Sequence, residues 1–529
     1  MKTILLFVLV FSSPALSLSQ NLKSGGKLKP EQAIMDIRHY SITLEVDPDQ
    51  KYIKGFTEID LILTQPSKML LFDLWHGFKI NQVWVNGKSK PFQFGEDDLI
   101  RIPQELAAGK IKVKVAYEGK PGIAEHAPWT GGFQWEKDEK GNPWIAVTCQ
   151  SEGGKIFFPC KDHPSDEPNE GADLFLAVPQ GLTAAGPGLL ISQATKKNKT
   201  TFHWKTNYTI SNYCLVFNIG KYKKVSRDYT TINGNNVKMD FYVLEEDESK
   251  ATHELDLMAD ACRILEKYFG EYPWVKEKIG LCETPHLGME HQTLIAYGNK
   301  FRYTKLGNKD FDWLLVHEFG HEWWANKITN RNWADLWIQE GICSFADALH
   351  IREDGGEQEY IKWMQRAGRD AKNKLPIVQA DDVDSDQAYH GDIYGKGAFF
   401  MHTLRYVMGD DLFFPTLKKF ANDPKYIYDN TVTTNDVEQY FSAANGKSLK
   451  PLFDLFLRST DKLEISVRQT DANKYEVQVL NLDFDLPFEI ITSSGPQKVV
   501  LNKKVTTIIS DTLPLIDKDT YYLKKITIE

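Results

Sequence analysis

Residues 313–321 read Trp-Leu-Leu-Val-His-Glu-Phe-Gly-His, and the two histidines of this segment are His317 and His321. Residues four positions apart lie on one face of an α-helix, so a single helix can present both imidazole rings to one metal ion. Glu318 stands directly after the first histidine. The segment therefore predicts a metal-binding helix, which we expect to run from about Asp310 to Asn326.

A third metal ligand is expected downstream, because catalytic zinc sites use three protein ligands and keep one position open for water. Glu340 lies nineteen residues after His321, near the start of a second predicted helix from Leu336 to Glu353. A turn at residues 329–332 can return that helix antiparallel to the first. His317, His321 and Glu340 together predict one zinc ion per chain. Asp335 is expected either to orient a ligand imidazole or to form an ordinary salt bridge.

Glu318 has the chemistry of a general base at such a site. Zinc lowers the pKa of a bound water to about 7, so hydroxide becomes accessible at neutral pH. A carboxylate one residue from a ligand can accept the water's proton and pass it to a leaving amine. A His-x-x-x-His pair alone is also compatible with unrelated core or surface histidines, but Glu340 at its distance favours the metal. These residues predict amide hydrolysis without separating an endopeptidase from an exopeptidase.

Upstream of this helix stands the segment Leu287-Gly288-Met289-Glu290-His291. At this point the sequence resembles the aminopeptidase N family of zinc metallopeptidases, which also includes the leukotriene hydrolases. The family's Gly-x-Met-Glu-Asn motif forms a strand edge whose glutamate binds the free α-amine of the substrate. Met289 and Glu290 match that motif, whereas Leu287 replaces its first glycine and His291 replaces its asparagine. The resemblance implies that residues 288–291 bind substrate and that the substrate is a peptide with a free N-terminus.

The resemblance extends over nearly the whole mature chain. Gln150 matches the family's glutamine that lines the pocket for the first side chain. Tyr394 opens the sequence Tyr-Gly-Lys-Gly before a predicted helix that reaches Val407, and its counterpart in the family donates a hydroxyl to the tetrahedral oxyanion. Stabilising that developing charge is commonly the largest catalytic contribution. Tyr389 lies nearby without such a context and is expected to be a buried aromatic residue.

The expected fold is multidomain α+β. A chain of 529 residues exceeds what one hydrophobic core usually supports. Short alternating runs such as 41–46 and 56–63 indicate strands, whereas the period becomes helical after residue 235 and returns to strands after residue 463. We therefore expect an N-terminal antiparallel β domain over residues 24–228, a mainly helical domain over 235–458, and a small C-terminal β domain over 460–529. The resemblance implies that the middle domain is a thermolysin-like catalytic domain and that the last domain is a β sandwich. The large helical domain that many relatives carry is not expected.

The N-terminus has the layout of a secretory signal peptide. A lysine at position 2 precedes the apolar run from Ile4 to Phe11, and small residues follow. The run is shorter than the ~20 residues that a membrane-spanning helix needs. We expect residues 1–19 to be removed, the mature protein to be exported to the periplasm or the extracellular space, and no stable membrane span to remain.

Charge and cysteine content limit the partners. A net charge of −9 without a basic block argues against nucleic-acid binding, which depends on clustered lysine and arginine. The six cysteines form no Cys-x-x-Cys pair, so we assign them no metal; one or two disulfides are left open.

Three other functions compete with an aminopeptidase. A non-catalytic peptide-binding protein would not need Glu318 or Tyr394. A thermolysin-type endopeptidase shares the metal ligands and the base but has no use for Glu290. An epoxide hydrolase related to the leukotriene enzymes needs a long lipid tunnel, for which the sequence gives no sign. A homo-oligomer that covers the cleft is left open.

Overall fold

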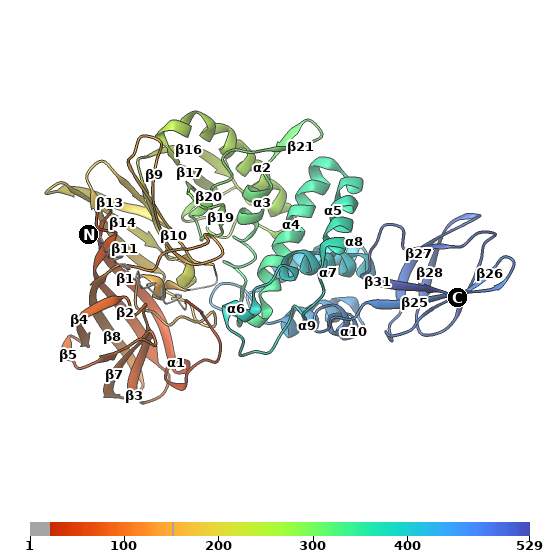
Figure 1. Ribbon diagram of the computed structural model, residues 1–529, viewed down its shortest axis with the longest axis horizontal. Helices are drawn as coiled ribbons and strands as arrows, with labels where there is room; N and C mark the ends of the chain where they lie inside the picture. Colours follow the sequence, from red (N-terminus) through yellow and green to blue (C-terminus); the bar gives the residue numbers. More distant parts are fainter. Residues whose placement is uncertain (1–21, 151–152) are drawn as a thin grey trace, which may run out of the picture.

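The computed structural model describes residues 22–150 and 153–529, so the predicted signal peptide lies outside the described residues. Figure 1 shows three parts along the long axis of the molecule: a β-rich N-terminal part, a mainly helical middle part and a β-rich C-terminal part. This arrangement confirms the predicted multidomain α+β fold. Within the described ranges, no helix is long and apolar enough to cross a membrane.

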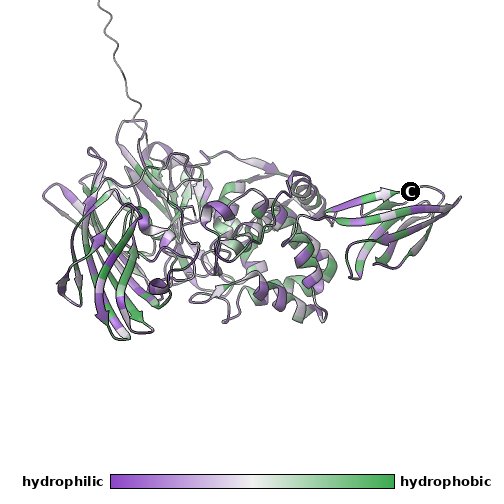
Figure 2. Ribbon diagram, turned by 60° about the horizontal axis from the view of Figure 1, so that its bottom comes forward, coloured by the Kyte–Doolittle hydropathy of each residue, from purple (hydrophilic) through white to green (hydrophobic). Residues whose placement is uncertain are grey.

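The N-terminal domain contains three sheets that share one hydrophobic core. Buried and partly exposed residues alternate along its long strands, as expected for strands with one face on a core, and Figure 2 shows the same alternation in hydropathy. The largest sheet contains, in spatial order, β13 (Leu189–Lys196), β14 (Lys199–Thr206), β11 (Ala172–Pro179), β1 (Met35–Asp47), β2 (Tyr52–Leu63), β8 (Gly109–Gly119), β4 (Phe78–Val85) and β5 (Lys88–Lys90). The two smaller sheets are β3 (Ser67–Asp73), β7 (Leu99–Leu106), β6 (Gln93–Phe94), and β12 (Thr183–Ala185), β15 (Asn218–Gly220), β10 (Pro143–Thr148), β9 (Gly132–Lys137). The short helices of this domain are α1 (Pro30–Ala33), η1 (Gly154–Ile156) and η2 (Asn212–Cys214).

The middle domain combines one five-stranded sheet with most of the helices. Its sheet has the order β16 (Tyr222–Thr230), β17 (Asn236–Leu244), β18 (Lys278–Glu283), β20 (Ile295–Tyr297), β19 (Gly288–Met289). Its helices are η3 (Glu245–Lys250), α2 (Ala251–Phe269), α3 (Trp313–Gly320), η4 (Trp333–Asp335), α4 (Trp337–Gly355), α5 (Glu357–Asp370), α6 (Ser385–Ala388), α7 (Asp392–Met408), α8 (Asp410–Phe420), α9 (Thr434–Asn445) and α10 (Lys450–Phe456). Two short pairs complete it, β21 (Thr304–Leu306) with β22 (Lys309–Phe311) and β23 (Thr329–Asn330) with β24 (Thr431–Val432).

The chain enters the middle sheet earlier than the sequence predicts. β16 pairs along its whole length with β17, so the expected boundary between residues 228 and 235 falls inside one hairpin. The change of sheet lies between Gly220, the end of β15, and Tyr222, the start of β16. Both domains have strands at this point, and strand periodicity does not reveal which sheet a strand joins.

The first metal-binding helix is shorter than predicted. α3 begins after Asp312, whose side chain caps it by accepting a hydrogen bond from the Leu315 N–H at 3.2 Å, and it ends at Gly320. The chain then turns, and the Asn326 N–H donates to the His321 carbonyl at 3.0 Å. Ala325 has φ of 149°, which no helix contains. The predicted end at Asn326 is therefore wrong.

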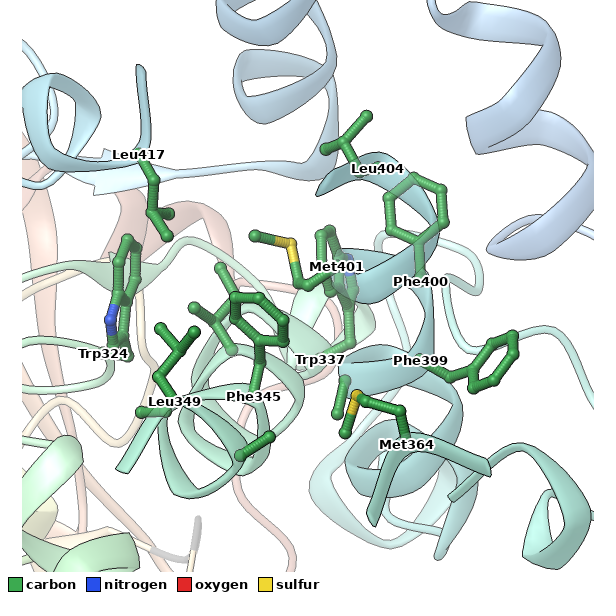
Figure 3. Close-up of a cluster of buried hydrophobic side chains, with 14 of the residues drawn as sticks. Trp324, Trp337, Phe345, Leu349, Met364, Phe399, Phe400, Met401, Leu404 and Leu417 are labelled. Carbon is green, nitrogen blue, oxygen red and sulfur yellow. The ribbon is translucent and has the colours of Figure 1, made fainter. Parts of the chain in front are cut away.

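The α4 and α7 helices pack closely, and this contact fixes the distance between the residues that they carry. A β-carbon on Gly341 of α4 would lie 2.8 Å from the Cα atom of Gly397 in α7. Figure 3 shows the apolar cluster around this helix pair. Its labelled members are Trp324, Trp337, Phe345, Leu349, Met364, Phe399, Phe400, Met401, Leu404 and Leu417.

The C-terminal domain has two small sheets that bury apolar side chains between them. Their strands are β29 (Thr506–Ile509), β26 (Lys474–Val479), β25 (Leu463–Asp471), β31 (Lys524–Ile528), and β28 (Gly495–Leu501), β27 (Leu486–Thr492), β30 (Leu515–Ile516). The rings of Tyr406 in α7 and Tyr521 stack with centroids 3.7 Å apart, and the Thr403 hydroxyl donates to the Tyr521 carbonyl at 2.6 Å. The C-terminal domain thus packs directly against α7, the helix that carries Tyr394.

Gly341→Ala is expected to lower the free energy of unfolding by about 1–3 kcal/mol, because the added methyl group overpacks the α4–α7 contact. Gly395→Ala in α7 is the matched control. Its added β-carbon meets only the Ala367 carbonyl oxygen, at 3.7 Å, and alanine favours a helix over glycine by roughly 0.5–1 kcal/mol. Urea unfolding of both variants measures the difference. Equal effects would contradict the close contact at Gly341.

Candidate active site

The three predicted metal ligands converge from two helices. His317 lies on α3, His321 directly follows the last residue of that helix, and Glu340 lies in the first turn of α4. Oε2 of Glu340 is 3.6 Å from Nε2 of His317 and 3.4 Å from Nε2 of His321. The two imidazole rings are nearly perpendicular, with centroids 4.9 Å apart. All three side chains are buried, so the ring nitrogens and the carboxylate face one another away from bulk water.

Nδ1 of each imidazole, on the side of the ring away from Glu340, contacts a hydrogen-bond acceptor. Nδ1 of His317 lies 3.1 Å from Oδ2 of Asp347, and Nδ1 of His321 lies 2.8 Å from the Trp324 carbonyl oxygen. Because an acceptor at Nδ1 fixes the proton there, each Nε2 is left with a lone pair for a metal. The turn that ends α3 at Gly320 is what brings the Trp324 carbonyl to this position.

The partner of His317 was not predicted. Asp347 lies seven residues after Glu340, which is two helical turns, so both side chains are on one face of α4. That spacing is the signal that could have identified it. Asp335, which was expected to orient an imidazole or form a salt bridge, instead accepts hydrogen bonds from the Thr434 N–H at 2.9 Å and hydroxyl at 2.5 Å, where α9 begins. That expectation is wrong.

The donor set fits a zinc ion. Oε2 of Glu340 is buried and has no hydrogen-bond partner among the described residues, although two imidazole nitrogens face it. An ionised carboxylate without a hydrogen bond is costly in a protein interior unless a cation compensates it. Two imidazole nitrogens and one carboxylate oxygen are ligands that catalytic zinc uses.

Glu318 lies against the edge of β19. A β-carbon on Gly288 would lie 2.6 Å from Oε1 of Glu318, so the glycine makes room for this carboxylate. One ligand atom each of Glu318, Glu290 and His321 lie within 4.8 Å of one another. Burial raises the pKa of Glu318 to about 8. The predicted base and the predicted amine-binding residue therefore share one site with a metal ligand.

Glu290 is buried directly after β19. Its Oε1 accepts a hydrogen bond from the Tyr213 hydroxyl at 3.0 Å, and its carbonyl accepts one from Nδ2 of Asn326 at 2.8 Å. Met289 before it is buried. His291 after it is fully buried, and neither ring nitrogen has a hydrogen-bond partner among residues 22–150 and 153–529. Of the predicted motif, the structure places Gly288 beside Glu318 and Glu290 beside the metal ligand His321, and His291 is buried in the protein.

The remaining predicted residues also reach the metal ligands. Nε2 of Gln150, from the N-terminal domain, is 3.5 Å from Oε1 of Glu340. Tyr394 is in the first turn of α7, and its ring centroid is 5.9 Å from that of His317. Burial raises the pKa of Tyr394 well above its usual value, so its hydroxyl stays protonated and can donate. The hydroxyls of Tyr389 and Tyr394 are 2.8 Å apart, a contact that the sequence did not predict.

A cleft of about 780 Å³ opens onto these groups. Trp129 and Gln150 line it from the N-terminal domain, and His317, Glu318 and Tyr394 line it from the middle domain. Much of the remaining wall is apolar or aromatic, and includes Leu287, Phe311, Trp313, Leu314 and Trp363. A cleft of this size can hold a short peptide segment next to the metal ligands.

Two histidines on one helix, a glutamate on the next and a carboxylate beside them form the kind of site found in zinc metallopeptidases. Comparison with known proteins agrees. Residues 37–214 match the peptidase M1 N-terminal domain, and residues 253–456 match the peptidase family M1 domain. The two matches cover well over half of the chain, which belongs to the M1 family of peptidases. The site takes one zinc ion, the catalytic metal of that family.

Relatives and solved structures extend this assignment. The chain is 20% identical to tricorn protease-interacting factor F2 of Thermoplasma acidophilum, over 88% of this chain and 60% of that protein. It is 25% identical to aminopeptidase N of Lactococcus lactis subsp. lactis, over 74% of this chain and 48% of that protein. It thus spans less than two thirds of the length of these relatives. The M1 zinc metallopeptidase from Deinococcus radiodurans shares its fold, with a TM-score of 0.66 and 20% identity over 80% of this chain and 94% of that one.

Asp347→Ala is expected to weaken zinc binding by roughly 10- to 100-fold, because outer-shell partners of metal-binding histidines contribute about that much affinity. Competition with a chromogenic zinc chelator measures the change. Asp335→Ala is the matched control, since it also removes a buried, hydrogen-bonded aspartate but one that contacts no metal ligand. Equal loss of zinc from both variants would show that Asp347 acts only through general stability.

Proposed function

We propose that this protein is a zinc-dependent aminopeptidase that hydrolyses the N-terminal peptide bond of peptides with a free α-amine. The observation that carries the proposal is the position of Glu290. Glu290 is buried, and one of its carboxylate oxygens lies within 4.8 Å of ligand atoms of Glu318 and His321. Glu318 in turn lines the largely apolar cleft. A carboxylate at that position can bind the α-ammonium group of the first substrate residue, whose peptide bond is the one that is hydrolysed.

The electrostatics favour this reading over an endopeptidase. Glu290 shares its surroundings with two other carboxylates, Glu318 and Glu340, and burial raises its pKa. Keeping a further carboxylate there is unfavourable unless a cation binds beside it. A substrate ammonium supplies that cation in every catalytic cycle of an aminopeptidase. An endopeptidase would place an uncharged peptide at the same point and gain nothing from Glu290.

The residues of the chain divide the chemistry between them. When bound to His317, His321 and Glu340, zinc would supply a Lewis acid that polarises the substrate carbonyl and makes water acidic. Glu318 is placed to accept the proton of the attacking water and to deliver it to the leaving nitrogen. The protonated Tyr394 hydroxyl can donate to the carbonyl oxygen as negative charge develops. Gln150, beside Glu340, faces the first residue of the substrate from the N-terminal domain.

The names of the relatives support this function. The Lactococcus protein is an aminopeptidase N, and a relative from Caenorhabditis elegans is a puromycin-sensitive aminopeptidase with 23% identity. A variant of the Deinococcus protein was crystallised with a Tyr-Ser-Ala substrate. We extend aminopeptidase activity to this chain because Glu290 and the metal ligands lie together in it.

We also propose that the protein is exported. Support comes from the sequence of residues 1–19, which has the basic start, apolar run and small residues of a signal peptide. N-terminal sequencing of the mature protein tests this, and an intact Met1 would contradict it.

Acetylation of the α-amine is expected to abolish cleavage of a peptide that is otherwise a good substrate, because the blocked peptide cannot place an ammonium at Glu290. Matched free and acetylated peptides, followed by mass spectrometry with the zinc-loaded enzyme, measure this. Release of the first residue from the free peptide alone is the expected result. Internal cleavage of the acetylated peptide would point to the endopeptidase.

Tyr394→Phe is expected to lower kcat and kcat/KM alike by roughly 10²- to 10³-fold, as for the loss of one oxyanion donor, with zinc content unchanged. Tyr389→Phe is the matched control. It removes the neighbouring hydroxyl, 2.8 Å away, and should cost less because Tyr394 keeps its own proton. Wild-type turnover in Tyr394→Phe together with a large loss in Tyr389→Phe would move the donor role to Tyr389.

A further inference from the structure

The amine-binding residue is held by the other domain. Tyr213 belongs to η2 of the N-terminal domain and is 2% exposed, and its hydroxyl donates to Oε1 of Glu290 at 3.0 Å. Glu290 itself is 4% exposed. The hydrogen bond is therefore shielded from water. In the protein interior, a hydrogen bond to a charged acceptor is stronger than the same bond at the surface.

The chain after Glu290 is held from the same side. Nε2 of Gln292 donates to the Thr209 carbonyl at 3.1 Å, and the Gly188 N–H donates to the Thr293 hydroxyl at 2.8 Å. Thr209 and Gly188 both belong to the N-terminal domain. The segment that carries Glu290 is thus fixed across the domain interface at three successive points, of which only Tyr213 touches the carboxylate.

The middle domain fixes the backbone of the same segment. Asn326 donates to the Glu290 carbonyl at 2.8 Å, and Glu322 accepts from the Thr293 N–H at 3.0 Å. These two contacts hold the main chain and do not engage the carboxylate of Glu290. The Tyr213 hydroxyl restrains the carboxylate itself, because it donates to Oε1 and leaves Oε2 to the substrate.

We propose that Tyr213 is a positioning residue for amine recognition, acting through Glu290. The inference rests on the proposed function, since it deepens the role given there to Glu290. Fixing one carboxylate oxygen orients the other before substrate arrives, so less freedom is lost on binding. It also keeps the carboxylate from turning toward His321, which has a ring nitrogen within 4.8 Å of a carboxylate oxygen of Glu290. Selectivity for a free amine then depends on a residue of the N-terminal domain.

Two matched probes isolate this effect. Leucine hydroxamate and 4-methylpentanohydroxamic acid have the same metal-binding group and the same branched side chain, and differ only in the α-amine. The branched side chain suits the apolar wall formed by Leu287, Phe311 and Leu314. The ratio of their dissociation constants, measured by calorimetry with the zinc-loaded protein, reports amine recognition independently of turnover.

Tyr213→Phe is expected to reduce that ratio by roughly 10- to 100-fold, the effect of one hydrogen bond to a charged group, while the affinity for the probe without an amine stays unchanged. Tyr117→Phe is the matched control. Tyr117 is a fully buried tyrosine of the same domain whose hydroxyl donates to the Phe157 carbonyl at 2.8 Å, far along the chain from the site. It should lower stability and leave the ratio at the wild-type value. Tyr213→Met provides a second variant without a donor if Tyr213→Phe folds poorly.

Glu290→Gln distinguishes a failure of the Tyr213 role from a failure of amine binding by Glu290. If Glu290→Gln loses amine selectivity while folded Tyr213→Phe and Tyr213→Met keep the wild-type ratio, the positioning role of Tyr213 is overturned and the proposed function stands. If the wild-type protein itself does not prefer the probe with the amine, Glu290 does not bind amines, and both the proposed function and the role of Tyr213 fail. Loss of selectivity in all three variants, with Tyr117→Phe unchanged, supports the inference.

Discussion

Two imidazole nitrogens and one carboxylate oxygen meet in a buried space, and the surrounding helices are arranged around that meeting point. The Nε2 atoms of His317 and His321 lie within 3.6 Å of one oxygen of Glu340. Such a group is costly to bury without a cation, so the arrangement favours a metal ion at this point. Asp347 orients the ring of His317, and the Trp324 carbonyl orients the ring of His321, each through Nδ1. The short α3 helix follows from this need, since a longer helix would carry the Trp324 carbonyl away from His321.

The α4 helix links the metal site to the rest of the catalytic domain. One face carries Glu340 and Asp347, and another packs against α7 so closely that glycines meet at the crossing. Because α7 also carries Tyr394, the spacing between the metal ligands and the hydroxyl donor is set by backbone contact rather than by flexible side chains. The apolar cluster in Figure 3 surrounds this helix pair and keeps it rigid.

Whether a feature of this structure could be predicted depends on whether local sequence spacing alone reveals the contact that decides it. The metal ligands could be predicted, because residues four apart on a helix share a face whatever the rest of the chain does. The end of α3, the role of Asp335 and the start of the middle sheet could not. The role of Asp335 is decided by Thr434, which is 99 residues away in the sequence. The end of α3 depends on the turn at Trp324, and the start of the middle sheet depends on the pairing of β16 with β17, neither of which periodicity reveals. Asp347 lies between these cases, since its spacing from Glu340 is helical but its contact with His317 depends on how α3 and α4 cross.

The two M1 domains are matched separately in sequence, but the chemistry depends on their interface. The middle domain supplies the metal ligands, the base and the hydroxyl donor. The N-terminal domain supplies Gln150 beside Glu340, Trp129 in the cleft wall and Tyr213 against Glu290. Lys278 of β18 binds the carbonyls of Gly186 and Gly188 across the same interface. A small rotation between the domains would therefore move the amine-binding carboxylate relative to the metal. In the proposed reaction, Glu290 would fix the first residue of the peptide, so the distance between the amine and the scissile carbonyl would depend on how the two domains pack.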